Sequence, residues 1–177
     1  MSVYIPNILL AVPRNPITAV GLPIALGFLS GSPSSKVANS NWYHNLHAPP
    51  GQPPREVFPF AWSLLYLSMG YASHVAVKAL DSSVVEGHRN ALSTGLALYY
   101  AQLVELVAHQ LRTLQTGLAL VDSVLLTGTT WYMTKLLDRP TNGEASYYLF
   151  PYCAWLAYAT YLNAGIWWLN RDGKVEK

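Results

Sequence analysis

Apolar stretches without charge alternate with short polar stretches along the chain. The clearest apolar stretch runs from Val57 to Val77 and contains no Asp, Glu, Lys or Arg. As a helix with a rise of about 1.5 Å per residue it would be about 31 Å long, which matches the hydrocarbon core of a bilayer. The pattern therefore predicts a membrane-spanning helix at this place.

Four further stretches of similar length and composition follow the same pattern. Together with the stretch around Val57 to Val77, the predicted spans cover residues 13–30, 56–79, 91–111, 117–137 and 145–169. The first two are separated by a long loop, Gly31 to Gln52, that opens with a flexible polar string of Gly, Ser and Pro. Asp81 to Asn90 and Asp138 to Glu144 read as shorter polar turns. The sequence thus predicts an all-α integral membrane protein, a single domain over residues 1–177 that forms a bundle of five transmembrane helices.

One helix face carries aromatic residues in two of the predicted spans. Trp62, Tyr66, Met69 and Ser73 fall at i, i+4, i+7 and i+11 of the second span, so they share a face. Trp155 and Ala159 share a face of the fifth span in the same way, because they are four residues apart. Two interpretations are open, an aromatic packing face between helices or the wall of a pocket for a flat apolar ligand.

The third span carries a polar stripe at helical spacing, formed by Tyr99, Gln102, Glu105, His109 and Arg112. Ionisable groups inside a membrane are candidates for function, and Glu105 with His109 could share a proton. Alternatively the helix ends early and residues 105–115 form an interfacial turn. In the fourth span, Asp122 is expected to face the bundle and to bond to a neighbouring helix.

Composition agrees with lipid as the main surrounding of this surface. The 177 residues are 51% hydrophobic and only 11% charged. The net charge of +2 and the lack of a dense basic cluster exclude nucleic acid as an expected partner. A single cysteine, Cys153, excludes an intramolecular disulfide and a cysteine zinc site, and the pair His44 and His47 has no further ligand nearby in sequence. We therefore expect no metal site and no resident cofactor.

Several motifs resemble those of the translocator protein family, also called tryptophan-rich sensory proteins or peripheral-type benzodiazepine receptors. The resemblance covers the chain from about Pro16 to Trp168. It is carried by Trp42-Tyr43, Leu46, Pro49, Pro53-Pro54, Val57-Phe58, Trp62, Tyr66, Met69-Gly70, Gln102-Leu103, Gly117 to Asp122, Pro151-Tyr152, Ala154 to Ala157 and Leu162-Asn163.

The resemblance implies a five-helix membrane bundle, often dimeric, that binds porphyrins, haem-related tetrapyrroles, sterols or synthetic aromatic ligands beneath its first loop. Trp62 and Trp155 match the two family tryptophans that flank the ligand, and Ala159 matches a pocket-lining alanine. The expected ligand-binding residues are Trp62, Tyr66, Met69, Trp155, Ala159, Gln102 and Asp122, and the expected loop residues over the pocket are Trp42, Tyr43 and Pro49. The expected location is the mitochondrial outer membrane, or a bacterial membrane for a prokaryotic chain.

Three functions are open on this basis. The first is a membrane receptor or carrier for tetrapyrroles. The second is a light- or oxygen-dependent enzyme that degrades porphyrin with its pocket tryptophans. No nucleophile triad or paired-carboxylate motif supports other catalysis, so enzyme activity is the less favoured expectation. The third is a scaffold without a ligand of its own.

The chain departs from the family pattern at three places. Gly51 stands where the family has a tryptophan, and Leu106 and His109 stand where it has Asn and Trp. In the fifth span, Ala164 and Gly165 replace the tyrosines of a cholesterol-recognition motif, and Trp168 replaces its arginine. Sterol binding through that motif is therefore not expected.

Overall fold

The computed structural model describes residues 3–38, 40–109 and 116–171, and the side chains of all of these except 30–38, 106–109 and 116. Within these ranges the regular structure is entirely helical, which confirms the predicted all-α class. The elements are α1 (Asn7–Arg14), α2 (Pro16–Ala38), α3 (Asn41–His44), α4 (Val57–Ser82), α5 (Glu86–His109), α6 (Thr116–Asp138), the 3-10 helix η1 (Arg139–Thr141) and α7 (Glu144–Asn170).

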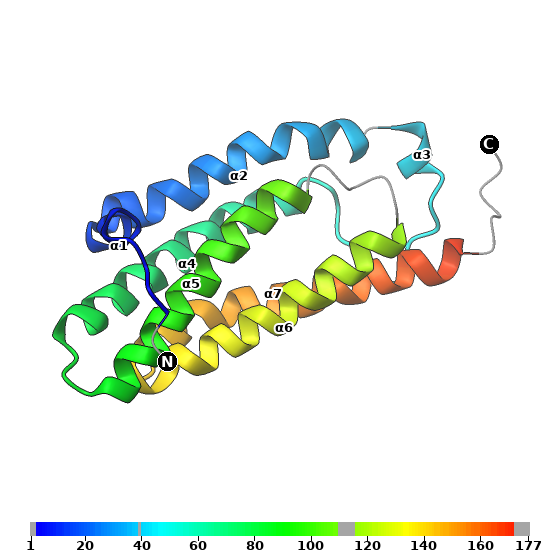
Figure 1. The fold of residues 1–177 in the computed structure, drawn as a ribbon. Coiled ribbons are helices and arrows are strands. Elements are labelled where there is room, and N and C mark those ends of the chain that lie inside the picture. Colours follow the sequence, from blue (N-terminus) through cyan, green and yellow to red (C-terminus); the bar gives the residue numbers. More distant parts are fainter. Residues whose placement is uncertain (1–2, 39, 110–115, 172–177) are drawn as a thin grey trace.

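Five long helices, α2, α4, α5, α6 and α7, run up and down along one bundle (Figure 1). The short helix α1, the α4–α5 connection and η1 lie at one end of the bundle, whereas α3 and the end of α7 lie at the other. Helix α4 is central, because it packs against α1, α2, α5 and α7. The first described helix, α1, and the end of α7 lie at opposite ends of the bundle.

The predicted inward face of α4 is buried in the structure. Tyr66, Met69 and Ser73 are each less than 9% exposed, and Trp62 is half-buried. Gly70 permits the closest approach to α2, since a Cβ at this position would lie 2.5 Å from the carbonyl oxygen of Ala19. Small residues at such crossings bring helix backbones into contact, which is how helices pack in lipid.

The first predicted span is divided in the structure. Asn15 is extended between α1 and α2, and its Oδ1 accepts a hydrogen bond from the N–H of Ile17 at 2.9 Å. Pro16 disfavours a helical Asn15, which explains the break. Helix α2 then continues to Ala38, so the prediction that a loop begins at Gly31 is wrong. Extending an existing helix needs no new nucleus, and this outweighs the weak helix propensity of the Gly-Ser string.

The two short connections, after α4 and after α6, lie where the sequence predicts turns. Asp138 to Glu144 forms η1 and a turn in which Asn142 and Gly143 are left-handed, with φ of 53° and 83°. The turn after α4 is shorter than predicted, because α5 already begins at Glu86. Glu105 and His109 both lie in α5, so the alternative that the helix ends before Glu105 is wrong. Residues 110–115 of that segment lie outside the described residues.

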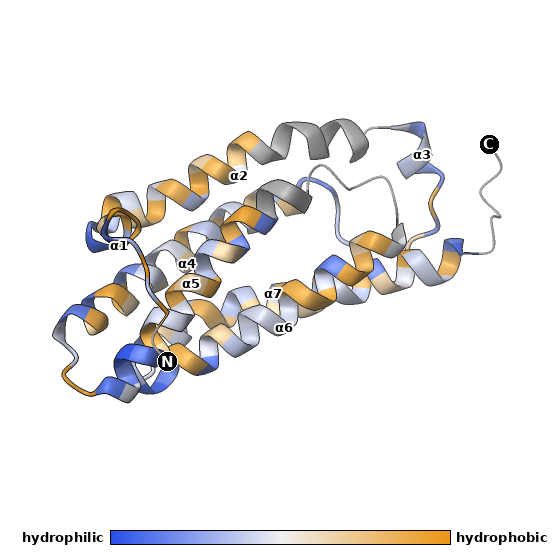
Figure 2. Ribbon diagram, viewed as in Figure 1, coloured by the Kyte–Doolittle hydropathy of each residue, from blue (hydrophilic) through white to orange (hydrophobic). Residues whose placement is uncertain are grey.

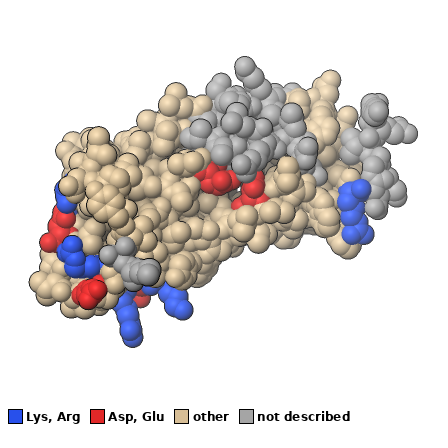
Figure 3. Space-filling model, in the orientation of Figure 1, with Lys and Arg blue, Asp and Glu red and all other residues tan. Residues whose placement is uncertain are grey.

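Large apolar side chains are exposed on all five long helices, for example Phe28, Phe60 and Val104. Apolar residues occur along the whole length of the bundle in Figure 2. On the face shown in Figure 3, the described Lys and Arg side chains gather at the two ends, and only acidic groups interrupt the flank between them.

Judged by length and apolarity, no one helix in the described part of the chain qualifies as a membrane span alone. The pair formed by Asn7–Arg14 and Pro16–Leu29 qualifies together and is bent by 103°. The five spans therefore stay a prediction.

Candidate functional site

Six aromatic rings from two helices meet beneath the loop that precedes α4, and we call them the aromatic cluster. They are Phe58, Trp62 and Tyr66 of α4 and Tyr152, Trp155 and Tyr158 of α7. Within the cluster, Trp62 stacks on Tyr66 with ring centroids 5.6 Å apart and meets Tyr152 edge to face at 6.4 Å. Trp155 meets Phe58 at 5.9 Å and Tyr158 at 5.7 Å, again edge to face. The two tryptophans expected to flank a ligand thus lie in two sets of ring contacts, one around Trp62 and one around Trp155, and each set joins α4 to α7.

The aromatic cluster extends into the hydrophobic core. Tyr66, Tyr152 and the predicted Met69 are buried, whereas Trp62 and Trp155 are half-buried at its edge. The ring of Tyr66 lies so close to Gly27 of α2 that a Cβ at position 27 would overlap it. The rings therefore pack against each other and against α2, as the packing interpretation of this face predicts.

Nε1 of Trp155 and Oε1 of Gln102 are buried and have no hydrogen-bond partner within the described part of the chain. Gln102 uses only its amide nitrogen, which donates to Oγ1 of Thr130 at 2.8 Å. A buried polar group without a partner costs about 1–3 kcal/mol. Among the described residues, the N–H of Trp155 on α7 and the side-chain carbonyl of Gln102 on α5 could thus bind a ligand, and the buried hydroxyl of Tyr99 on α5 is a third such group.

The remaining predicted pocket residues lie on α6 and α7. Ala159 is half-buried, one turn beyond Trp155. Asp122 is half-buried next to Ser123, whose carbonyl oxygen accepts a hydrogen bond from Thr160 Oγ1 at 3.1 Å. This bond joins α6 to α7, and it places Asp122 at the edge of their interface.

The loop residues predicted to cover the pocket differ in burial, since Trp42 is exposed, Tyr43 is half-buried and Pro49 is buried. Trp42 is 37% exposed, and the ring of Tyr43 carries the Arg55 guanidinium 5.2 Å from its centroid. Arg55 also contacts both ring nitrogens of His44, at 3.0 and 3.2 Å. A cavity of about 460 Å³ opens here and is lined by Tyr43, His44, Leu46, Ala48, Gln52, Pro53, Pro54, Arg55 and Ile166.

Side chains of α7 fasten the second part of this loop. The hydroxyl of Tyr158 donates to the carbonyl of Gly51 at 2.5 Å, and that of Tyr161 donates to the carbonyl of Pro50 at 2.9 Å. Asn170 bonds both backbone groups of His47, at 3.0 and 2.9 Å. The predicted loop residue Pro49 is buried against Gly165.

The structure thus brings Trp62, Tyr66, Met69 and Trp155 together in one hydrophobic core, with the two tryptophans at its edge. Of the ten predicted site residues, only Tyr43 lines this loop cavity. Sequence reasoning missed Phe58, Tyr152 and Tyr158, although each lies three or four residues from a predicted tryptophan. It also missed the anchors Tyr161 and Asn170, for which the sequence carries no signal.

The described part of the chain contains no group of three or more His, Cys, Asp or Glu residues that could hold a metal ion.

The chain is similar to proteins of one family over most of its length. The model of the TspO/MBR family matches residues 19–169, a range that contains every predicted pocket and loop residue. A translocator protein homolog of Schizosaccharomyces pombe is 39% identical, over 90% of this chain and 94% of its own. The translocator protein of Bos taurus is 35% identical, over 91% of this chain and 93% of its own. The tryptophan-rich protein TspO of Chlorobaculum tepidum is 33% identical, over 85% and 92%.

Proposed function

The chain belongs to the TspO/MBR family, and from this premise we propose that it is a membrane receptor or carrier that binds tetrapyrroles between α4 and α7. Proteins of this family are membrane-embedded. The proposed ligand is a flat apolar macrocycle such as a porphyrin or a haem-related compound, and sterols are a second class of ligand for the same site.

The observation that carries this proposal is the aromatic cluster. Trp62 and Trp155 expose part of their indole rings at its edge, and each already makes two ring contacts with a neighbour. A macrocycle would exchange these ring–ring contacts for larger stacking surfaces. Such aromatic contacts are worth about 0.5–1.5 kcal/mol each beyond area burial.

The polar atoms beside the cluster support a ligand that has its own polar centre. Nε1 of Trp155 is a donor and Oε1 of Gln102 is an acceptor, and both lack partners among the residues that the structure describes. A tetrapyrrole contains ring nitrogens and carries carboxylate groups, so it has atoms of both kinds to offer. Pairing either buried atom would recover part of the cost of leaving it unpaired.

The relatives support a location for this activity. We propose the mitochondrial outer membrane as its location, because the relatives include translocator proteins of a yeast and a mammal and the family resemblance implies this membrane for eukaryotic members. Fractionation of cells that express a tagged chain tests this location.

The binding test is a titration of the purified protein with protoporphyrin in darkness. We expect Trp62→Ala and Trp155→Ala to weaken binding by about tenfold each, because each change removes stacking surface. Trp167→Ala is the matched control, since Trp167 is exposed at the far end of α7. Equal affinities of all three variants would refute the assignment of this site, and no binding by the wild type would refute the function.

A further inference from the structure

A second cavity, of about 750 Å³, lies at the end of the bundle where α4 meets α5 and η1 meets α7. Its walls come from both connections and from the last turns of α4. The lining residues are Tyr71, His74, Val75, Lys78, Ala79, Asp81, Ser82, Ser83, Val84, Val85, His88, Pro140, Thr141, Asn142 and Glu144. Most of them fall in the two short turns predicted to lie outside the membrane spans, so the predicted topology puts the cavity at the depth of lipid headgroups.

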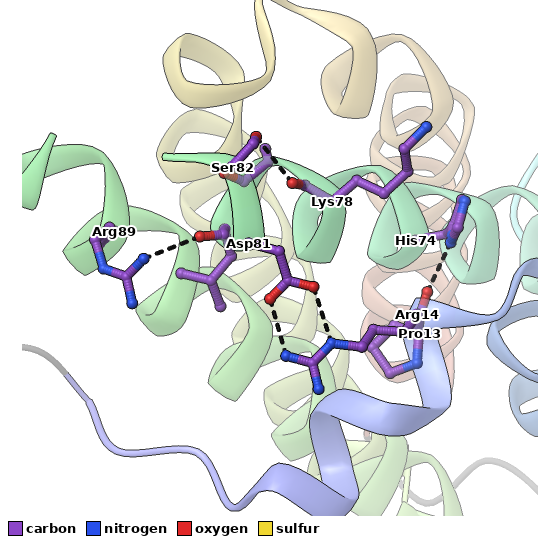
Figure 4. A network of polar contacts seen from close by, with 9 residues as sticks. Pro13, Arg14, His74, Lys78, Asp81, Ser82 and Arg89 are labelled. Carbon is purple, nitrogen blue, oxygen red and sulfur yellow. Dashed lines mark hydrogen bonds and ion pairs between the residues drawn. The ribbon is translucent and has the colours of Figure 1, made fainter. Parts of the chain in front are cut away.

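The charge of Asp81 is compensated within the protein. Arg14 donates from Nε and Nη2 to the two carboxylate oxygens of Asp81, at 2.8 and 2.9 Å (Figure 4). The hydrogen bonds from Arg14 hold the pKa of the Asp81 carboxyl below its ordinary value. Arg89 is engaged as well, because it donates to the carbonyls of Leu80 and Ser83. Among the described residues that line the cavity, the remaining formal charges are therefore one cation, Lys78, and one anion, Glu144.

The wall around Lys78 is suited to a phosphate. Lys78 extends away from the Arg14–Asp81 pair, as Figure 4 shows. His74 precedes it by one helical turn, and Nδ1 of His74 lies 2.7 Å from the carbonyl oxygen of Pro13. A carbonyl oxygen only accepts, so Nδ1 carries a proton, and Nε2 donates to a phosphate oxygen when the ring is an imidazolium. His88 lines the cavity from α5, which adds a second imidazole to the same site.

The wall around Glu144 is suited to an ammonium group. Glu144 is exposed at the start of α7, and the ring of Tyr71 lines the cavity from α4. Tyr71 packs edge to face on Tyr148, one turn beyond Glu144, with ring centroids 4.7 Å apart. A carboxylate beside aromatic rings is the usual surrounding of an alkylammonium ion.

We propose that this cavity binds the headgroup of a zwitterionic phospholipid, with its phosphate at Lys78, His74 and His88 and its ammonium group at Glu144 and Tyr71. The apolar residues of the lining would contact the part of the lipid next to its headgroup. The site is separate from the aromatic cluster, so the proposal does not depend on tetrapyrrole binding.

The test measures lipid binding to the full chain in a sugar-based detergent, by native mass spectrometry. We expect phosphatidylethanolamine or phosphatidylcholine to bind about tenfold more tightly than phosphatidylglycerol, which has the phosphate but no ammonium group. Lys78→Met and Glu144→Gln should each lower the affinity for the zwitterionic lipids by about tenfold. Equal binding of phosphatidylglycerol, or unchanged binding by both variants, overturns the proposal.

Two matched variants and a soluble probe complete the design. Lys135→Met removes an exposed cation near the same end, and Glu86→Gln removes an acid from the first turn of α5; neither residue lines the cavity. Lys135→Met and Glu86→Gln should bind lipid like the wild type. If Lys78→Met and Glu144→Gln lose binding, the conservative variants Lys78→Arg and Glu144→Asp should retain it. Glycerophosphoethanolamine has the headgroup without chains, and it should bind far more weakly. Equal binding of this soluble compound would overturn the assignment to lipid.

Discussion

Pro49 of the loop that precedes α4 packs directly on Gly165 of α7, and this contact leaves no room for a side chain at position 165. A Cβ at position 165 would lie 2.5 Å from Cβ and 2.6 Å from Cγ of Pro49. Gly165→Ala must therefore push the loop away from α7, since the proline ring is rigid and the helix backbone is fixed by its own hydrogen bonds. We expect this variant to open the loop locally without unfolding the bundle.

The size of the effect follows from two opposing contributions. Four hydrogen bonds between the loop backbone and the side chains of Tyr158, Tyr161 and Asn170 hold the loop. At about 0.5–1.5 kcal/mol each they contribute about 2–6 kcal/mol. Overpacking by one methyl group costs about 1–3 kcal/mol. The loop should therefore remain closed most of the time, while its opening equilibrium rises about 5- to 150-fold.

Hydrogen–deuterium exchange of residues 45–56 measures this opening, and the amide of His47 is its most direct reporter because it donates to Asn170. Gly128→Ala in α6 is the matched control, since a Cβ at position 128 meets nothing within 4 Å. Both substitutions gain the same helix propensity, about 1 kcal/mol, so only the contact with Pro49 distinguishes them. Exchange in the loop that is equal in the two variants would refute this account of how the loop is held.

Three further predictions concern the bundle itself. Tags at the two ends of the chain should lie on opposite sides of the membrane, and protease protection of both tags on one side would contradict the five-helix topology. Gly70→Ala should lower thermal stability by about 1–3 kcal/mol, because its Cβ would meet backbone atoms of Ala19, whereas Gly21→Ala should not; the reverse order would contradict the α2–α4 packing. Asp81→Asn should destabilise the protein at neutral pH. Arg14 lowers the folded-state pKa of Asp81, so the stabilisation by this ion pair is present above the ordinary Asp pKa of about 4 and is lost as the pH falls through the folded-state pKa. A difference in melting temperature between Asp81→Asn and the wild type that persists at about pH 2 would contradict this account.

Much of the helical architecture could be predicted from the chain because its polar turns are strong local signals. The ends of α4, α6 and α7 lie within a few residues of the predicted ones, since charged residues and Gly or Asn punctuate the apolar stretches there. The start of the first long loop could not be placed in the same way. Gly, Ser and Pro favour a turn locally, but α2 continues through them to Ala38 because an existing helix extends more easily than a new one begins.

The candidate site was predictable only in part, for a related physical reason. Helical periodicity identifies which residues of one helix share a face, and this led to Trp62, Tyr66 and Met69. Periodicity contains no information about the facing element. The contacts of Tyr152 with Trp62 and of Phe58 with Trp155 join residues about ninety positions apart, and they depend on how α4 and α7 are placed side by side. The same holds for the pairing of Arg14 with Asp81.

The two glycines at which the chain departs from the family pattern lie on the two sides of one contact surface. Gly51 has a φ of 86°, which a residue with a side chain rarely adopts, and its carbonyl accepts the hydrogen bond of Tyr158. Gly165 provides the space that Pro49 occupies. Where the family pattern has a tryptophan and a tyrosine, this chain therefore brings the loop backbone directly onto α7. The two departures act differently, because a side chain at position 165 would meet Pro49, whereas a Cβ at position 51 would meet nothing within 4 Å and would instead strain the backbone at its φ of 86°. Gly165→Tyr alone should consequently open the loop more than Gly165→Ala does, and restoring tryptophan at position 51 as well should not close it, since the backbone contacts on which this loop relies would already be lost.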